Sequence, residues 1–268
     1  MNVDNRPVLG VSTAAFFPRS LNEVFAILVN QPLRELELMP QSPSECRPEF
    51  ARELARRFGD RFHFCAIHFP SILQAFFSNP YPSAFEYGRQ LCRDLASLAG
   101  QLDASVIVTH APWERMSTGT FLQAAIDNMR ELCDAAVGHG VVVGIENLVS
   151  SPMVRTPSDM RAFAANIDRP NLGYVLDVTH VYESGQNVLD FVEQLSPLVH
   201  IHASDFHPSK GQHLVPGDGT VDWKRLATAL RRARYSGSII MELVSKALGA
   251  DPSAALRRGA AVLQDAFS

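Results

Sequence analysis

The chain has 268 residues, of which 46% are hydrophobic, and its formal net charge at pH 7 is -4. This length is enough for one large domain with its own hydrophobic core. The near-neutral charge gives no basic surplus for binding nucleic acid, so it favours a protein that handles small molecules. The amino-terminal residues lack the basic and apolar runs of a signal peptide, and no apolar stretch reaches membrane-spanning length. We therefore expect a cytoplasmic protein that does not enter the membrane.

The four cysteines are widely scattered and form no CxxC pair. Three of them, Cys65, Cys92 and Cys133, lie within apolar patterns, whereas Cys46 does not. Such positions favour buried free thiols over disulfides or zinc ligands.

Short β-rich runs alternate with longer helical patterns along the whole chain. Most of the runs are almost continuously apolar, as is typical of parallel strands whose outer face is covered by helices. We expect eight strands, which begin near Val8, Arg34, Phe62, Ser105, Val141, Leu172, Val199 and Gly237.

Between these strands, apolar residues recur at the three- and four-residue spacing of amphipathic helices. The clearest segments begin at Pro48, Phe121 and Asp222, and Thr156 is a plausible helix cap. Eight strand–helix units in this length predict an α/β fold, a (β/α)8 TIM barrel that forms a single domain over residues 1–268. A doubly wound open sheet is the alternative, but no glycine-rich dinucleotide-binding loop follows the first strand.

Residues that can bind a metal occupy the predicted carboxyl-terminal ends of strands three to eight, where barrels of this kind hold their active sites. Taken alone, a histidine at such a position is more often a hydrogen-bonded core residue than a metal ligand, and an acid is more often one partner of a structural ion pair. Glu242 is harder to explain in this way, because an acid flanked by aliphatic residues must be paired, protonated or metal-bound. The full set is His68, His110, Glu146, Asp177, His180, His202 and Glu242.

Four of these residues, Glu146, Asp177, His202 and Glu242, come one each from strands five to eight and could converge on one divalent metal ion. Three carboxylates and one imidazole suit Mn²⁺ or Mg²⁺, with Co²⁺ or Zn²⁺ possible. Open positions on such an ion would accept two oxygens of a hydroxy-carbonyl substrate. Glu146 and Glu242 could then transfer a proton through a metal-stabilised enediolate, which is the chemistry of aldose–ketose isomerisation or epimerisation.

These residues, in this order, resemble the xylose isomerase-like TIM-barrel superfamily, which holds sugar and sugar-phosphate isomerases and epimerases, hydroxypyruvate isomerases and endonuclease-IV-type AP endonucleases. The resemblance covers essentially the whole chain and is carried by "IHFPS", "VTHAPW", "GIENL", "LDVTH", "HIHASD" and "MELV". It implies the same four metal ligands, with the two glutamates as the acid–base pair. It also implies a small carbohydrate or hydroxy-keto acid substrate and, at the level of the family, a possible homodimer. We expect the substrate to be contacted by His68, His110, His180, His213 and Trp113.

The nuclease branch of the superfamily is the main alternative. It uses three zinc ions, and His68 and His110 match ligands of an additional zinc, while His180 and His213 match ligands of the third. The third zinc also needs an aspartate two residues before the loop histidine, where this chain has Gly211. A metal-dependent dehydratase or lyase on the same scaffold, and a barrel that binds without catalysis, are further alternatives.

The sequence also departs from the ketohexose epimerases that it resembles. Pro208 and Pro152 stand where those epimerases carry an arginine and a glutamate. Lys210 or Arg155 in nearby loops could instead bind a phosphate or carboxylate, with solvation as the alternative for both. Aromatic residues of the loops after strands three and four could form an apolar wall over the site or pack against helices; they are Phe69, Phe76, Phe77, Tyr81 and Trp113.

Two histidines lie two residues apart in "LVHIHASDF", and strand alternation points both to the same side. Register and the resemblance assign the metal to His202. We expect His200, one layer deeper, to be a hydrogen-bonded supporting or core residue. Asp205 either orients His202 or holds the following loop.

Overall fold

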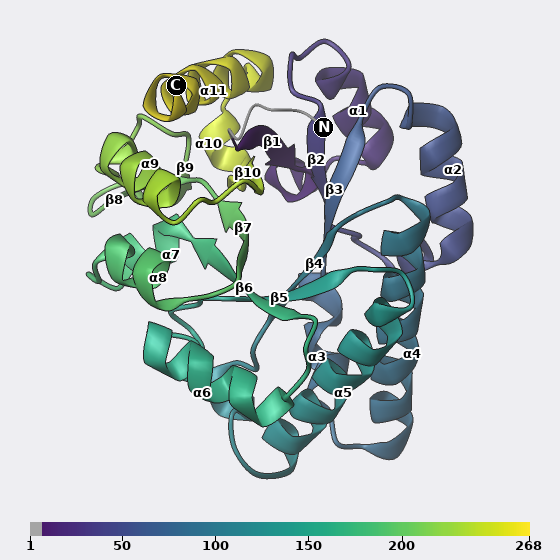
Figure 1. Ribbon diagram of the computed structural model, residues 1–268. Coiled ribbons are helices and arrows are strands. Elements are labelled where there is room, and N and C mark those ends of the chain that lie inside the picture. The colour runs from purple at the N-terminus through teal and green to yellow at the C-terminus, as the bar shows by residue number, and fades with distance from the viewer. Residues whose placement is uncertain (1–6) are drawn as a thin grey trace. The chain divides into compact units, whose positions relative to one another are not determined.

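Eight parallel strands pair in the order of a closed barrel in the computed structural model, which describes residues 7–268 (Figure 1). The order around the barrel is β1-β10-β7-β6-β5-β4-β3-β2. The predicted (β/α)8 fold is thus confirmed, and the open-sheet alternative is wrong. The strands are β1 (Val8–Ser12), β2 (Glu35–Leu38), β3 (His63–His68), β4 (Val106–His110), β5 (Val142–Glu146), β6 (Leu172–Asp177), β7 (Leu198–His202) and β10 (Ser238–Met241).

Helices follow the strands, and two of them start at residues that the sequence indicated, Thr156 and Asp222. The Thr156 side chain accepts the backbone N–H of Asp159 and receives the reciprocal bond of a capping box, and Asp222 caps the helix that starts at Trp223. The helices are α1 (Leu21–Leu28), α2 (Pro48–Phe58), α3 (Gln74–Phe77), α4 (Pro82–Gln101), α5 (Gly119–Val137), α6 (Pro157–Ile167), α7 (Val178–Glu183), α8 (Val188–Gln194), α9 (Trp223–Arg232), α10 (Ser245–Leu248) and α11 (Pro252–Phe267).

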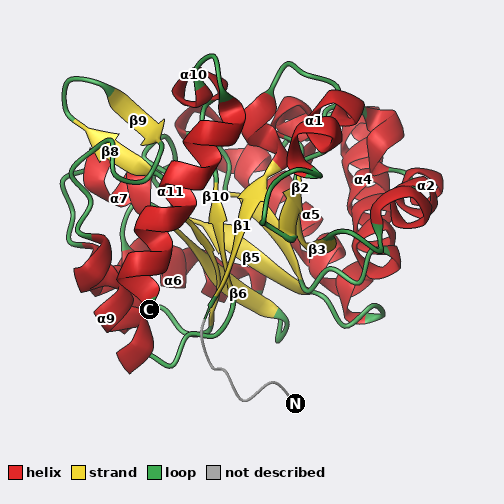
Figure 2. Cartoon of the chain, turned by 90° about the horizontal axis from the view of Figure 1, so that it is seen from above, coloured by secondary structure: helices red, strands yellow, loops and turns green. Residues whose placement is uncertain are grey.

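The chain divides into two compact units, and the first consists of the residues up to Glu37 together with Leu176–Ser268. In this unit β1 pairs in parallel with both β2 and β10, and β10 pairs with β7. A Cβ atom on Gly10 of β1 would come within 2.3 Å of the backbone oxygen of Glu35, so only glycine fits this close approach. The helices α9 and α11 pack against each other (Figure 2) and bury Leu226, Leu230, Leu256 and Leu263.

A small antiparallel hairpin, β8 (Asp205–His207) and β9 (Gly211–Leu214), follows β7 in this unit and was not predicted. Its strands of three and four residues are too short and too polar to show an alternating pattern. Gly211, the first residue of β9, has a φ of +98°, a conformation that favours glycine. Helix α7 packs against both strands of the hairpin, which lies beside it in Figure 2.

The second unit spans Leu38–Val175 and contains β3, β4 and β5 with most of β6. Its parallel register places His110 of β4 opposite Glu146 of β5. Helices α4 and α5 run side by side (Figure 1), and their buried side chains are mainly those of alanine and leucine. The four cysteines of the chain are free and buried, as predicted. Among the described residues, no helix is long and apolar enough to cross a membrane.

Candidate metal centre

The residues singled out in the sequence stand at the carboxyl-terminal ends of the strands. Five of them are the last residue of their strand: His68, His110, Glu146, Asp177 and His202, which end β3, β4, β5, β6 and β7. Glu242 directly follows the last residue of β10. The strand ends therefore present imidazoles and carboxylates where apolar runs stop.

In the first unit, the imidazole of His202 lies close to two carboxylates. Its Nδ1 atom is 3.2 Å from Oε2 of Glu242 and 3.9 Å from Oδ2 of Asp177. The side chains of His202 and Asp177 are fully buried, and that of Glu242 is 13% exposed. Two carboxylates so close together and away from water repel each other unless a positive charge lies near them. The donor atoms of these three residues therefore fit a divalent cation.

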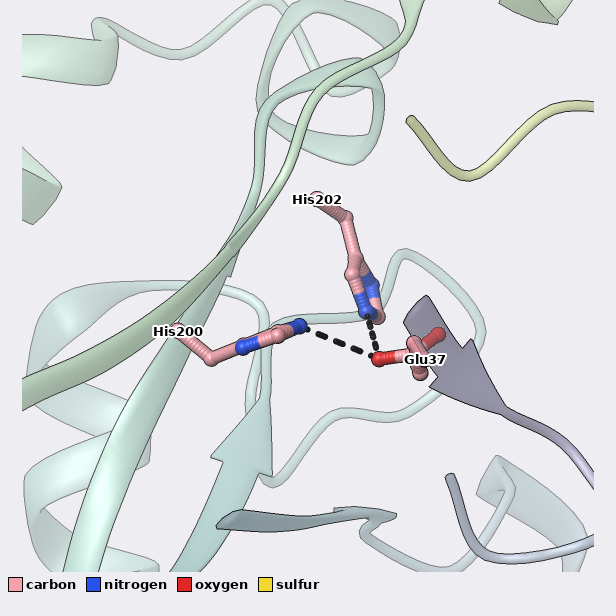
Figure 3. A group of neighbouring side chains, drawn as sticks. All are labelled: Glu37, His200 and His202. Atoms are coloured by element: carbon pink, nitrogen blue, oxygen red, sulfur yellow. Dashed lines mark hydrogen bonds and ion pairs between the residues drawn. The ribbon is translucent and has the colours of Figure 1, made fainter. Parts of the chain in front are cut away.

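A further carboxylate, Glu37 of β2, meets this group from the other side and was missed in the sequence. Its Oε2 atom is 2.8 Å from Nε2 of His202 and 3.1 Å from Nε2 of His200 (Figure 3). Glu37 is fully buried between Leu36 and Leu38, which are also fully buried. An acid between two leucines of a buried strand is the same signal that drew attention to Glu242, so the sequence did contain it.

Two histidines border the group on the side of Asp177 and Glu242. Asp177 accepts the backbone N–H of His180 through Oδ1 at 2.9 Å and so caps helix α7. The rings of His180 and His213 are almost perpendicular, with an interplanar angle of 89° and centroids 5.2 Å apart. His213 Nδ1 lies 3.2 Å from the backbone carbonyl oxygen of Glu242. Both imidazoles keep about 15% of their side-chain surface exposed, so a solute can reach them as it can reach Glu242.

Asp205 ties down the loop that carries His213. Its Oδ1 atom accepts the backbone N–H groups of Phe206 and Val221 at 3.0 and 2.9 Å. Its Oδ2 atom accepts the N–H of Gly217 at 2.8 Å and the indole N–H of Trp223 at 3.4 Å. Of the two roles expected for Asp205, these bonds support the holding of the loop.

In the second unit, His68, His110 and Glu146 form a compact group. Glu146 Oε2 lies 2.9 Å from Nε2 of His110 and 3.4 Å from Nε2 of His68. The Nδ1 atom of His68 is 2.8 Å from the backbone oxygen of Phe69, which can only accept, so Nδ1 carries a proton. A lone pair on the Nε2 atom would repel an ionised Glu146, and a cation bound to both groups would remove that repulsion. This group also fits a divalent metal ion.

The loop residues expected to contact substrate or an anion are mostly engaged in packing and loop bonds. Phe69 and Phe77 are buried and stack edge to face with ring centroids 4.9 Å apart, so they pack rather than line an open wall. Trp113 is half-buried, with the Arg115 guanidinium 5.5 Å from its ring centroid. Lys210 donates to the backbone oxygen of Asp218 at 3.0 Å. Arg155 donates to that of Val149 at 2.8 Å.

The strand order and these residues define a (β/α)8 barrel with a candidate divalent-metal centre at the carboxyl-terminal ends of its strands. The model of one protein family, described as the xylose isomerase-like TIM barrel, matches residues 24–266. The chain therefore belongs to the xylose isomerase-like TIM-barrel family, as its motifs predicted.

Related sequences include both uncharacterised proteins and enzymes. An uncharacterised protein of Methanocaldococcus jannaschii is 26% identical over 249 residues, which cover 87% of this chain and 82% of that protein. A D-psicose 3-epimerase of Agrobacterium fabrum is 26% identical over 119 residues, 44% of this chain and 40% of the epimerase. An inosose dehydratase of Lacticaseibacillus casei is 26% identical over 182 residues, 58% of this chain and 57% of the dehydratase.

Solved structures with the same fold include two sugar epimerases. The 3-keto-D-glucoside 4-epimerase of E. coli has a TM-score of 0.79 at 19% identity, covering 97% of this chain and 100% of that one. The D-psicose 3-epimerase of Clostridium cellulolyticum, solved with D-tagatose, has a TM-score of 0.77 at 20% identity, covering 96% and 99%. At this level of identity the likeness shows the fold.

Proposed function

We propose that this protein is a divalent-metal-dependent isomerase or epimerase that acts on a small sugar, sugar phosphate or hydroxy-keto acid. The observation that carries the proposal is the buried imidazole of His202 beside the carboxylates of Asp177 and Glu242. A site of this composition calls for a cation, and its family contains proteins named as sugar epimerases. The partial sequence match to a D-psicose 3-epimerase supports the same class of chemistry.

The ligand set of the proposal consists of Asp177, His202 and Glu242 together with Glu146, which ends β5. Three carboxylates and one imidazole form an oxygen-rich set that suits Mn²⁺ or Mg²⁺ better than a soft metal. When bound, such a cation supplies a Lewis acid that polarises the substrate carbonyl and offsets the negative charge that develops on its oxygen.

Proton transfer is the task of the two glutamates in this proposal. Glu242 is partly exposed, so its carboxylate can approach a substrate carbon, whereas Asp177 is fully buried and is restricted to binding. One glutamate removes the proton next to the carbonyl, and Glu146 or Glu242, whichever did not act first, returns a proton to the substrate. His180 and His213 border Glu242 and would donate hydrogen bonds to substrate hydroxyls, which fixes the carbon in reach of the base.

The test is solvent exchange with the Mn²⁺-loaded protein in D2O, using a panel of ketoses, ketose phosphates and hydroxy-keto acids. We expect deuterium at the carbon next to the carbonyl of at least one compound. Glu146→Gln and Glu242→Gln should each abolish the exchange because they remove a proton carrier, while Glu193→Gln, an exposed glutamate of α8, should leave it unchanged. The absence of deuterium from the whole panel with wild-type protein would refute the proposal.

A second candidate function, a zinc-dependent AP endonuclease, is favoured by the group of His68, His110 and Glu146. The two imidazoles share one carboxylate oxygen, and this set suits zinc well. Elemental analysis of protein purified without added metal, together with an assay for nicking of DNA at abasic sites, separates the two functions. More than one zinc per chain with nicking would establish the nuclease, whereas one metal ion per chain without nicking would exclude it.

Dehydration is a third outcome that the same proton-transfer groups support, because loss of a leaving group can follow removal of the same proton. The inosose dehydratase of L. casei is a partial relative. Formation of an unsaturated product from a polyhydroxy ketone, followed by its ultraviolet absorbance, would assign the protein to this reaction rather than to epimerisation.

A further inference from the structure

Glu37 is a buried acid on β2, a strand that contributes nothing to the proposed ligand set. The carboxyl group is fully buried, and the leucines on either side of it are fully buried as well. A carboxylate without water around it is costly unless it receives hydrogen bonds or faces a positive charge. The neighbours of Glu37 therefore explain why an acid is kept at this position.

These neighbours are the imidazoles of His200 and His202, which approach one oxygen atom of Glu37 from different directions (Figure 3). Oε2 is 2.8 Å from Nε2 of His202 and 3.1 Å from Nε2 of His200. The two rings are perpendicular, with centroids 5.3 Å apart. The contact with His202 is a hydrogen bond, and bonds to an ionised acceptor are stronger than neutral ones. The contact with His200 is at ion-pair distance and does not have the geometry of a hydrogen bond.

The bond to Glu37 decides which nitrogen of His202 holds the proton. A neutral imidazole has one N–H and one lone pair, and the partner of one nitrogen fixes the other. With the N–H on Nε2 toward Glu37, the lone pair of His202 is on Nδ1, 3.2 Å from Glu242 and 3.9 Å from Asp177. Without Glu37, the opposite tautomer would let Nδ1–H donate to Glu242, and that bond would compete with a cation.

We propose that Glu37 is a positioning residue that keeps His202 in the tautomer able to bind a metal ion through Nδ1, with the imidazole of His200 packed against the same carboxylate oxygen. The inference rests on the proposed function, because it requires His202 to be a metal ligand. Carboxylates that orient a metal-binding histidine in this way typically raise metal affinity about 10- to 100-fold. Glu37 thus supports the site without touching the substrate.

The test measures Mn²⁺ affinity by titration calorimetry and the His202 tautomer by ¹⁵N NMR of the metal-free protein. Glu37→Leu should weaken Mn²⁺ binding about 10- to 100-fold and shift the His202 proton from Nε2 toward Nδ1. Glu37→Gln should weaken it less, since its amide oxygen still accepts an N–H, and this partial rescue would not follow from a purely structural role. Glu35→Gln removes a carboxylate from the same strand and should leave both readings unchanged.

Three results would overturn the inference and leave the proposed function standing. Wild-type Mn²⁺ affinity in Glu37→Leu, or an unchanged His202 tautomer in that variant, would each show that Glu37 does not position the ligand. Two ions per wild-type chain, one of them lost in Glu37→Gln, would show that Glu37, His200 and His202 hold a metal themselves. Failure of the wild-type protein to bind Mn²⁺ at all would instead overturn the proposed function, and the inference with it.

Discussion

Replacement of Asp205 by asparagine is expected to destabilise the protein strongly although it changes neither size nor shape. Each oxygen of the Asp205 carboxylate accepts two N–H groups in the loop after β7. An asparagine must point its NH2 group at one of these two pairs, whichever way the amide is turned. Either orientation leaves one short bond, to Gly217 at 2.8 Å or to Val221 at 2.9 Å, and one longer bond unmade.

The size of the effect follows from the number of donors left without an acceptor. A buried N–H without a partner costs about 1–3 kcal/mol, and the longer of each pair of bonds contributes the smaller share. We therefore expect Asp205→Asn to lower the free energy of unfolding by about 2–4 kcal/mol. For a chain of this size that corresponds to a melting temperature lower by roughly 4–16 °C.

Chemical denaturation at pH 7 measures this loss, and amide hydrogen exchange locates it. The exchange of the Gly217 and Val221 amides should accelerate in Asp205→Asn, because their acceptor is weakened or gone. Asp222→Asn is the matched control: it is the same substitution in the same loop, at a helix N-cap where asparagine serves as well as aspartate. Equal stability of the two variants would refute the reasoning, since it would mean that the carboxylate does not hold the loop.

Two further predictions concern charge and metal binding. Burial raises the pKa of Glu131, but hydrogen bonds from Arg89 and Arg93 outweigh this effect and leave the pKa below its usual value. The ionised carboxylate therefore stabilises the fold at any pH above its unfolded pKa. This stabilisation is lost as the pH falls through the folded pKa. Glu131→Gln should therefore destabilise the protein at pH 7 and progressively less toward pH 3 in urea titrations, and a difference independent of pH would contradict this. His202→Ala should abolish Mn²⁺ binding, while His200→Ala should mainly lower stability or rate; equal metal loss in calorimetry of both would show that the ligand has been assigned to the wrong histidine.

The strands were predictable because parallel barrel strands, covered on their outer face, read as short apolar runs between turn residues. The run that ends in "VGIE" illustrates this, since Val142–Glu146 is buried almost throughout and its acid stands at the boundary of the strand. The hairpin Asp205–Leu214 lacks such a signal, because its stability comes from bonds across the loop to Asp205 rather than from an apolar face. Local sequence does not reveal contacts between residues ten or more positions apart.

The strand-end residues of the site could be found for a related reason, while Glu37 could not be found by the same rule. His68, Asp177 and their counterparts are the last residues of their strands, where a polar side chain after an apolar run is conspicuous. Glu37 is the last but one residue of β2, so a search of strand ends passes over it. Its signal is the leucine on either side, which Glu35 lacks, and accordingly Glu37 is fully buried whereas Glu35 is partly exposed.

The different roles proposed for His200 and His202 rest on their positions, two residues apart on β7. Alternation points both imidazoles to the same face, and both reach the same oxygen of Glu37. His202, at the strand end, has in addition the carboxylates of Asp177 and Glu242 beside its second nitrogen. Two histidines at this spacing can therefore differ in role when another strand of the barrel, here β2, places one buried acid against both of them. The spacing of the two histidines fixes the face, and the carboxylates of Asp177 and Glu242, which lie near His202, are the basis of the proposed difference in role.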